Sequence, residues 1–154
     1  MFSDQDRSFM EMALDEAQLS FNDNEVPVGA IIVKDNEVIG YGHNQVIHTN
    51  NVTSHAEINA IIDASKNTNN YRLNNTKMYV TLEPCHMCAK AIIDARLDEV
   101  IFAAPEPKTG SIISIDNFFE RINLNHKTSY RHGLLMNESA KLLKKFFIHR
   151  RKFS

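Results

Sequence analysis

The stretch LEPCHMCAK, residues 82–90, contains both cysteines of this 154-residue chain, three positions apart. Pro84 suits the first turn of a helix, where its missing N–H would have no partner. We therefore expect a helix from Pro84 to about Arg96. Cysteines at i and i+3 project to one side of such a helix, and its positive end favours their thiolate forms. The pair is a candidate for metal binding, for redox chemistry or for a disulfide.

The composition favours one domain in a reducing compartment. Hydrophobic residues make up 43% and charged residues 23%, as in an ordinary globular protein. The longest apolar run, VGAIIV at 28–33, is far shorter than the ~20 residues of a membrane-spanning helix. The polar, acidic start MFSDQDRSFM does not resemble a presequence. We therefore expect a cytoplasmic protein without a membrane association, a single domain over 1–154, and no structural disulfide.

The hydrophobic pattern predicts alternating helices and strands. Apolar residues recur at helical spacing after a capping Ser3 or Asp4, and VGAIIVK and EVIGYGH flank a turn at DNE. Further strands are expected at 77–82, 99–103 and about 127–130, and further helices from His55, near 115–120 and, with many basic residues, at about 137–152. This order predicts an α/β fold, a mixed five-stranded sheet with helices on both faces.

Further metal ligands must come from the seven histidines. His43 and His48, at H-x4-H spacing, would formally complete a closed Cys2His2 zinc site, but a strand end and a loop do not indicate convergence. His86 lies between the cysteines and should point away from a shared metal. A thioredoxin-like redox pair would normally follow an early strand, and EPCHMC occurs late in the chain.

His55 is the best candidate for the third ligand. In SHAE it stands at the start of a predicted helix, and Glu57 follows two positions later. One histidine and two cysteines, Cys85 and Cys88, leave a fourth tetrahedral position for water, as in catalytic zinc sites. Zinc lowers the pKa of that water towards ~7, and a nearby carboxylate such as that of Glu57 then transfers protons.

The combination H-x-E followed by P-C-x-x-C is the known signature of zinc nucleobase deaminases. It assigns zinc to His55, Cys85 and Cys88 and proton transfer to Glu57. The spacing does not identify the base that is deaminated.

Over nearly its whole length the sequence resembles bacterial tRNA-specific adenosine deaminases. The matching stretches include EVPVGAIIV (25–33), SHAEINAI (54–61), MYVTLEPCHMCAKAI (78–92), KTG (108–110) and LLKKFFIHRR (142–151). The resemblance implies a three-layer αβα cytidine-deaminase-like fold, one Zn²⁺ per chain and a homodimer. It also implies conversion of adenosine to inosine at the wobble position of a tRNA anticodon, that of an arginine tRNA.

The resemblance further implies roles for individual residues. Asn44 would hold the ribose of the target nucleotide, and Val28 and Ala56 would pack around the flipped base. The residues expected near the anticodon stem-loop are Glu25, Lys108, Phe147, Arg150 and Arg151. We expect one member of the pair Phe146 and Phe147 to be a core residue.

The charge distribution bears on the partner. Six basic residues and no acidic residue occur between Lys141 and Lys152, so the rest of this chain of formal net charge −2 carries −8. A basic tail on an acidic body indicates a polyanionic partner, unless the tail is only a solvated helix face.

Two other functions stay open. A deaminase of free guanine or cytosine bases or nucleosides would share the zinc motif. A structural zinc protein that binds RNA through its tail would need a fourth ligand, His43 or His48.

Overall fold

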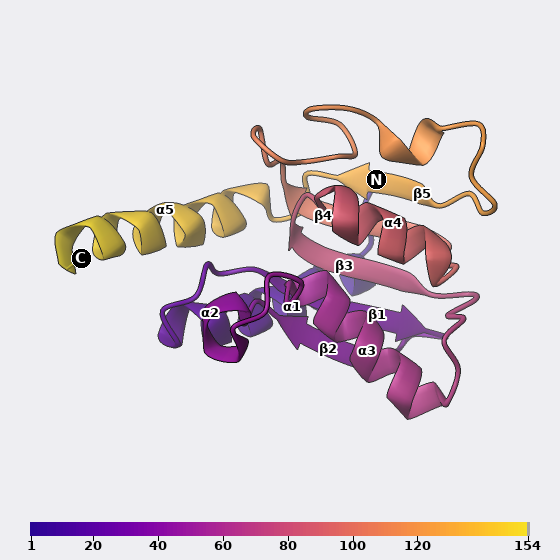
Figure 1. Cartoon of the computed structure of the whole chain (residues 1–154), viewed down its shortest axis with the longest axis horizontal. Coiled ribbons are helices and arrows are strands. Elements are labelled where there is room, and N and C mark those ends of the chain that lie inside the picture. Colours follow the sequence, from indigo (N-terminus) through magenta and orange to yellow (C-terminus); the bar gives the residue numbers. More distant parts are fainter. Residues whose placement is uncertain (154) are drawn as a thin grey trace.

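The computed structural model describes the backbone of residues 1–153 and the side chains of residues 1–152 (Figure 1). The elements are α1 (Asp4–Asn22), β1 (Gly29–Lys34), β2 (Glu37–His43), α2 (Val46–Thr49), α3 (Ala56–Thr68), β3 (Lys77–Leu82), α4 (His86–Asp94), β4 (Glu99–Ala104), the 3-10 helix η1 (Phe118–Glu120), β5 (Ser129–His132) and α5 (Met136–Phe153).

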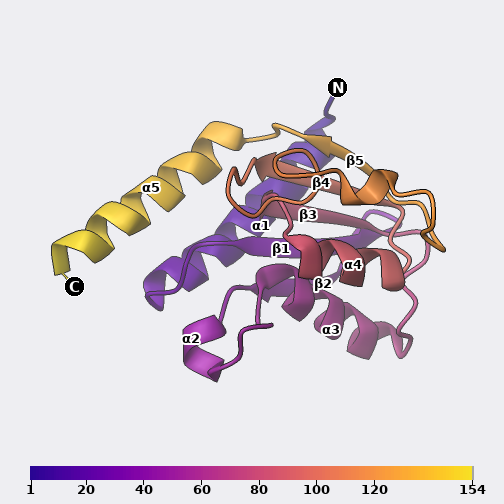
Figure 2. The same ribbon diagram turned by 45° about the horizontal axis from the view of Figure 1, so that its top comes forward.

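One five-stranded sheet forms the middle layer, in the order β2-β1-β3-β4-β5. Strand β1 is antiparallel to β2 and β3, whereas β3, β4 and β5 are parallel. Helices α3 and α4 cover one face, and α1 and α5 lie on the other (Figures 1 and 2). The predicted α/β architecture with a mixed sheet is therefore confirmed. Within residues 1–153, no helix is long and apolar enough to cross a membrane.

Local sequence signals fix several element ends. Ser3 caps α1 in a capping box, in which the Ser3 hydroxyl accepts from the N–H of Asp6 and the Asp6 carboxylate accepts from the N–H of Ser3. The hairpin between β1 and β2 turns at Asp35 and Asn36, whose φ angles of 50° and 62° suit the right-handed twist of the strands.

Helix α3 lies unusually close to β2, and this contact places the start of α3. A Cβ atom at Gly42 would lie 2.3 Å from the carbonyl oxygen of Ala56 and from the backbone nitrogen of Ala60. Only glycine permits this approach of two backbones. His55, the N-cap of α3, is thereby held beside the carboxyl end of β2.

Four expectations about element bounds were wrong. Helix α4 begins at His86 rather than Pro84 and ends at Asp94 rather than Arg96, which has a left-handed φ of 69°. The region near 115–120 holds only η1, which follows a loop whose backbone N–H groups at 112–114 bond to the side chain of Glu83. The expected loop after β2 contains α2. Strand β5 begins at Ser129, two residues later than expected.

Candidate active site

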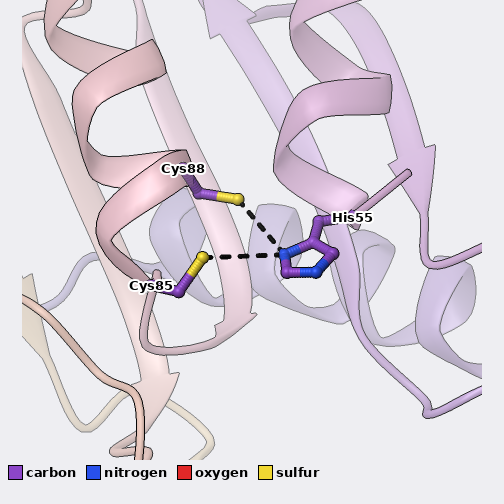
Figure 3. A group of neighbouring side chains, drawn as sticks. All are labelled: His55, Cys85 and Cys88. Atoms are coloured by element: carbon purple, nitrogen blue, oxygen red, sulfur yellow. Dashed lines mark hydrogen bonds between the residues drawn. The ribbon is translucent and has the colours of Figure 1, made fainter. Parts of the chain in front are cut away.

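Two helix starts bring three metal-binding side chains together. His55 is the N-cap of α3, Cys85 is the N-cap of α4, and Cys88 lies in the first turn of α4. The Nδ1 atom of His55 lies 3.5 Å from the Sγ of Cys88 and 3.7 Å from the Sγ of Cys85 (Figure 3). All three ligand atoms lie within 4.8 Å of one another.

These separations fit a tetrahedral zinc ion. With Zn–N near 2.05 Å and Zn–S near 2.3 Å, a tetrahedral angle separates nitrogen and sulfur by about 3.6 Å. The observed 3.5 and 3.7 Å bracket that value. One imidazole and two thiols are also a donor set that zinc prefers. The residues present therefore fit zinc.

Cys85 is prepared to carry a negative charge. A hydrogen bond with Cys88 lowers the pKa of the Cys85 thiol to about 4, and His55 adds to the effect. The same hydrogen bond, together with burial, raises the pKa of Cys88. A hydrogen bond with Cys85 raises the pKa of His55. The first proton thus leaves Cys85, at the positive end of α4, and thiolate is the form that binds metal.

Glu57 lies in the first turn of α3 beside this group and is only 4% exposed. Burial raises the pKa of its carboxyl group to about 7. Within the described residues, the cluster of His, Cys, Asp and Glu side chains able to share a metal consists of His55, Cys85 and Cys88. Glu57 thus lies beside the predicted metal ligands but is not one of them.

A pocket of about 290 Å³ opens onto these residues. Its lining comprises Glu25, Val26, Val28, Asn44, Val46, Ile47, His55, Ala56, Glu57, Leu82, Glu83, Cys85, Glu106 and Thr109. The volume is at the lower end for ligand pockets. The pocket therefore suits one ring system rather than a large ligand.

Asn44 presents an unused acceptor in this pocket. Its Nδ2 donates to the carbonyl oxygen of Val26 at 3.2 Å, and its backbone N–H donates to the carbonyl oxygen of Val28 at 3.1 Å. Its Oδ1 is buried and, within the described residues, has no hydrogen-bond partner. Because an unpaired buried acceptor is costly, a ligand donor is the expected partner of this oxygen.

Glu25 fixes the side of the pocket formed by α2. It is 1% exposed, and its carboxylate accepts from the backbone N–H groups of Ile47 and His48 at 3.1 and 2.8 Å. The ring of His48 lies 3.1 Å from the same carboxylate. Burial opposes ionisation of Glu25, but these contacts together lower its pKa. Glu25 therefore acts on the pocket through α2.

The loop of residues 105–116, called the wall loop below, forms another side. Glu106 and Thr109 line the pocket from it. Lys108, between them in sequence, is exposed, and its backbone N–H donates to the Glu106 carboxylate at 3.0 Å. Burial of Glu83 opposes its ionisation, but hydrogen bonds from the wall loop, led by that of Ser114, lower its pKa.

The remaining predicted residues lie outside the pocket lining. Phe147, Arg150 and Arg151 are exposed on α5, whose C-terminal part extends beyond the sheet (Figures 1 and 2). Phe146, in contrast, is 2% exposed and packs edge-on against Phe21 of α1, so Phe146 is the core member of the pair.

The other histidines of the motif region have partners of their own. The ring of His43 lies 3.4 Å from the Glu16 carboxylate, and the ring of His86 lies 2.8 Å from that of Asp116. With His48 beside Glu25, neither candidate for a fourth ligand joins the metal group.

Sequence reasoning missed several lining residues. No element or role was predicted for Val46 and Ile47, and the part played by Glu83 in the wall was not predicted. Thr109 lies within the KTG stretch, in which only Lys108 was given a role. Leu82 ends a strand that was predicted in full, and its alternation with Val80 would have placed both on one face.

Comparison with known proteins agrees with the geometry. Residues 3–104 match the family model of the cytidine and deoxycytidylate deaminase zinc-binding region. The tRNA-specific adenosine deaminase of Aquifex aeolicus is 42% identical over 139 residues, which are 90% of this chain and 91% of that protein.

Solved structures show the same fold. A structure from a study of A-to-I editing by tRNA:A34 deaminases at the wobble position of transfer RNA is 41% identical, with a TM-score of 0.85, over 88% of this chain and 98% of that one. Guanine deaminase from Nitrosomonas europaea, with a TM-score of 0.76 over 95% of this chain and 85% of that one, is 19% identical and shares the fold alone. The chain therefore belongs to the zinc-binding cytidine and deoxycytidylate deaminase family, among its tRNA-specific adenosine deaminases, which confirms the predicted zinc cofactor and deaminase class.

Proposed function

We propose that this deaminase converts adenosine to inosine by hydrolysis at the wobble position of a tRNA anticodon, that of an arginine tRNA. The observation that carries the proposal is the pocket of about 290 Å³, which joins the His55–Cys85–Cys88 group and Glu57 to an unpaired acceptor on Asn44. The identity of 42% to a relative named as a tRNA-specific adenosine deaminase favours adenosine in tRNA over other bases.

The chemistry is divided between the metal ligands and one carboxylate. His55, Cys85 and Cys88 would hold the zinc ion, and zinc when bound lowers the pKa of water so that hydroxide is available near neutral pH. The carboxylate of Glu57 takes up a proton from water and delivers it to the ring nitrogen. It then transfers the proton of the newly attached hydroxyl group to the exocyclic amine, which leaves as ammonia. Its burial keeps bulk water from competing for that proton.

The rest of the pocket holds the nucleotide. Val28, Ala56 and Leu82 supply apolar surface for a base that has left its stack. The free Oδ1 of Asn44 accepts from a ribose hydroxyl group. A looped RNA suits such a site because its bases unstack at low cost.

The RNA outside the pocket meets positive charge. Lys108 is exposed and lies in sequence between the lining residues Glu106 and Thr109, and Arg150 and Arg151 are exposed on α5 together with Phe147. The body of the chain would repel RNA without such groups. We therefore assign α5, within a single deaminase domain, to binding of the anticodon stem-loop, with Glu25 contributing through its hold on α2.

We also propose a homodimer and a cytoplasmic location. The resemblance supports the dimer. Light scattering after size exclusion gives the mass of the assembly. The location follows from the tRNA substrate.

The decisive experiment is mass-spectrometric detection of inosine in tRNA transcripts incubated with the purified protein. We expect inosine at the wobble position of an arginine tRNA and faster turnover of its anticodon stem-loop than of free adenosine, because remote contacts supply binding energy that a nucleoside lacks. The Glu57→Ala protein is the matched control. Faster turnover of free guanine or cytosine would contradict the proposal.

A further inference from the structure

All hydrogen bonds to the side chain of Glu83 that the structure describes come from the wall loop. The donors are the backbone N–H groups of Glu106, Ile112, Ile113 and Ser114 and the hydroxyl group of Ser114, at 3.0, 2.9, 2.8, 3.0 and 2.5 Å. Glu83 is 3% exposed, and each carboxylate oxygen accepts from more than one donor. A single buried side chain thus accepts from four of the ten backbone N–H groups of this loop, which has no strand or helix to pair them.

The residues next to Glu83 hold the same loop. The carbonyl oxygen of Pro84 accepts from the N–H of Ser111 at 2.9 Å, and the ring of His86 lies 2.8 Å from the Asp116 carboxylate. Cys85, between them, belongs to the metal group. The segment of residues 83–86 therefore ties the wall loop to the metal-binding end of α4.

Gly110 makes this close packing possible. A Cβ atom there would lie 2.3 Å from the carboxylate carbon of Glu83 and 2.6 Å from the carbonyl oxygen of Glu106. Neither contact is permitted, so any side chain at position 110 would push the wall loop away from Glu83. The close approach of Glu83 therefore explains why the last residue of the KTG stretch has no side chain.

The wall loop carries the pocket residues Glu106 and Thr109. Its shape depends on the bonds to Glu83, since it has no regular structure between Ala104 and η1. We propose that Glu83 is a positioning residue for substrate binding, whose carboxylate holds the wall loop against the nucleotide. The inference rests on the proposed function for the identity of the substrate.

The test compares the wild-type protein with Glu83→Gln. Glutamine keeps the size of the side chain but turns one acceptor oxygen into a donor, so at least the bond from the N–H of Glu106 is lost, whereas the Ser114 hydroxyl group can turn to accept. We expect KM for the anticodon stem-loop to rise about 10-fold while kcat changes less than about threefold, because a wall that contacts ground and transition states alike affects KM. Amide exchange should accelerate at Ile112 and Ser114 and stay slow at Val80, and zinc content should stay unchanged.

Asp63→Asn is the matched control, because the Asp63 carboxylate also accepts a backbone N–H, that of Tyr41 at 2.9 Å, away from the pocket lining. It should leave KM and the exchange of the wall loop unchanged. The inference is overturned if Glu83→Gln raises KM without faster exchange, if it accelerates exchange without raising KM, or if it lowers kcat in proportion to lost zinc.

A milder variant covers the case in which Glu83→Gln does not fold. Ser114→Ala removes only the hydroxyl donor and should raise KM about threefold with faster exchange at Ile112, as expected for one hydrogen bond; unchanged values overturn the inference. A wild-type protein that deaminates no adenosine stem-loop would contradict the proposed function instead. The dissociation constant of the stem-loop, compared between wild type and variants, would then still decide the role of Glu83.

Discussion

The Nδ1 atom of His55 lies 3.5 Å from the Sγ atom of Cys88, although the two residues are 33 positions apart. The contact exists because the N-termini of α3 and α4 meet at one end of the sheet. It unites residues from two short motifs into one metal group, and the first predictions concern that group.

Cys88→Ser should abolish zinc binding and lower the melting temperature by roughly 10 °C. A ligand at 1,000 times its dissociation constant stabilises by about 4 kcal/mol, and each kcal/mol is worth about 2–4 °C in a chain of this size. Elemental analysis and calorimetry measure both effects.

The control for this experiment is the double variant His43→Ala, His48→Ala, which should keep one zinc per chain. Loss of zinc from the double variant would show that the site is closed by one of these histidines, and would support a structural role for the metal.

Glu57→Ala should retain zinc and fold but lose about 10²–10⁴-fold in deamination rate, the usual range for a removed acid–base group. Single-turnover measurements on the stem-loop, with zinc content determined in parallel, separate a lost proton transfer from lost metal. Near-normal turnover would show that another group moves the protons.

Asp6 should make stability depend on pH in the acid range. Burial opposes ionisation of Asp6, but hydrogen bonds from Tyr79 and Ser3 and the charge of Arg131 together lower its pKa. A carboxylate with a lowered pKa contributes stability that is complete above its unfolded value of ~3.9 and is lost as the pH falls through the folded value.

The measurement is the melting temperature of Asp6→Asn between pH 6 and pH 3. We expect this variant to be less stable by about 1–3 kcal/mol at pH 6, because the Tyr79 hydroxyl group and Arg131 lose a charged partner. The melting temperature of the variant should then fall less steeply on acidification than that of the wild type. Parallel curves for the two proteins would contradict the assignment, and Asp15→Asn, at an exposed position of α1, serves as control.

Neutralising Lys145, Arg150, Arg151 and Lys152 with glutamine should weaken tRNA binding and flatten its salt dependence. Each engaged charge contributes roughly 0.7 to the slope of log affinity against log salt, so four charges account for at most about 3. Fewer are expected, since Lys145 lies over the Phe21 ring and Arg150 over the Phe146 ring.

The control neutralises four exposed basic residues on other elements, namely Arg7, Lys34, Lys66 and Lys127. This variant matches the change in net charge and should retain most of the affinity and slope. Equal effects of the two variants would show that α5 is a solvated helix face.

Substitution of Phe146 should affect stability, and substitution of Phe147 should affect RNA binding. Phe146→Ala removes a ring that is 2% exposed and packs against Phe21, and should cost about 3–5 kcal/mol of stability. Phe147→Ala affects a ring that is 47% exposed and should leave the melting temperature within about 2 °C of wild type while weakening stem-loop binding. A stability loss at Phe147 as large as at Phe146 would contradict the assignment of Phe147 to RNA.

Much of the fold could be predicted because its signals are local. The strand β3 was predicted with its observed bounds, since a short apolar run between polar segments needs no distant partner to be recognised. Ser3 before α1 and the turn at Asp35 and Asn36 are likewise written in neighbouring residues. The predicted metal residues follow from spacing, because H-x-E and C-x-x-C each place their side chains at a helix start.

The walls of the pocket depend on contacts between residues far apart in the chain. Helix α2 is held by Glu25, and residues 112–114, just before the region expected as a helix, give their backbone donors to Glu83. A local pattern cannot show these hydrogen bonds, because the carboxylates that accept them come from other elements. The sequence by itself thus predicted the layers, the candidate metal residues and the proton-transfer candidate. Only the tertiary structure decided the shape of the pocket, the burial of Phe146 rather than Phe147, and the unpaired acceptor of Asn44, since each depends on which distant atoms satisfy or exclude one another.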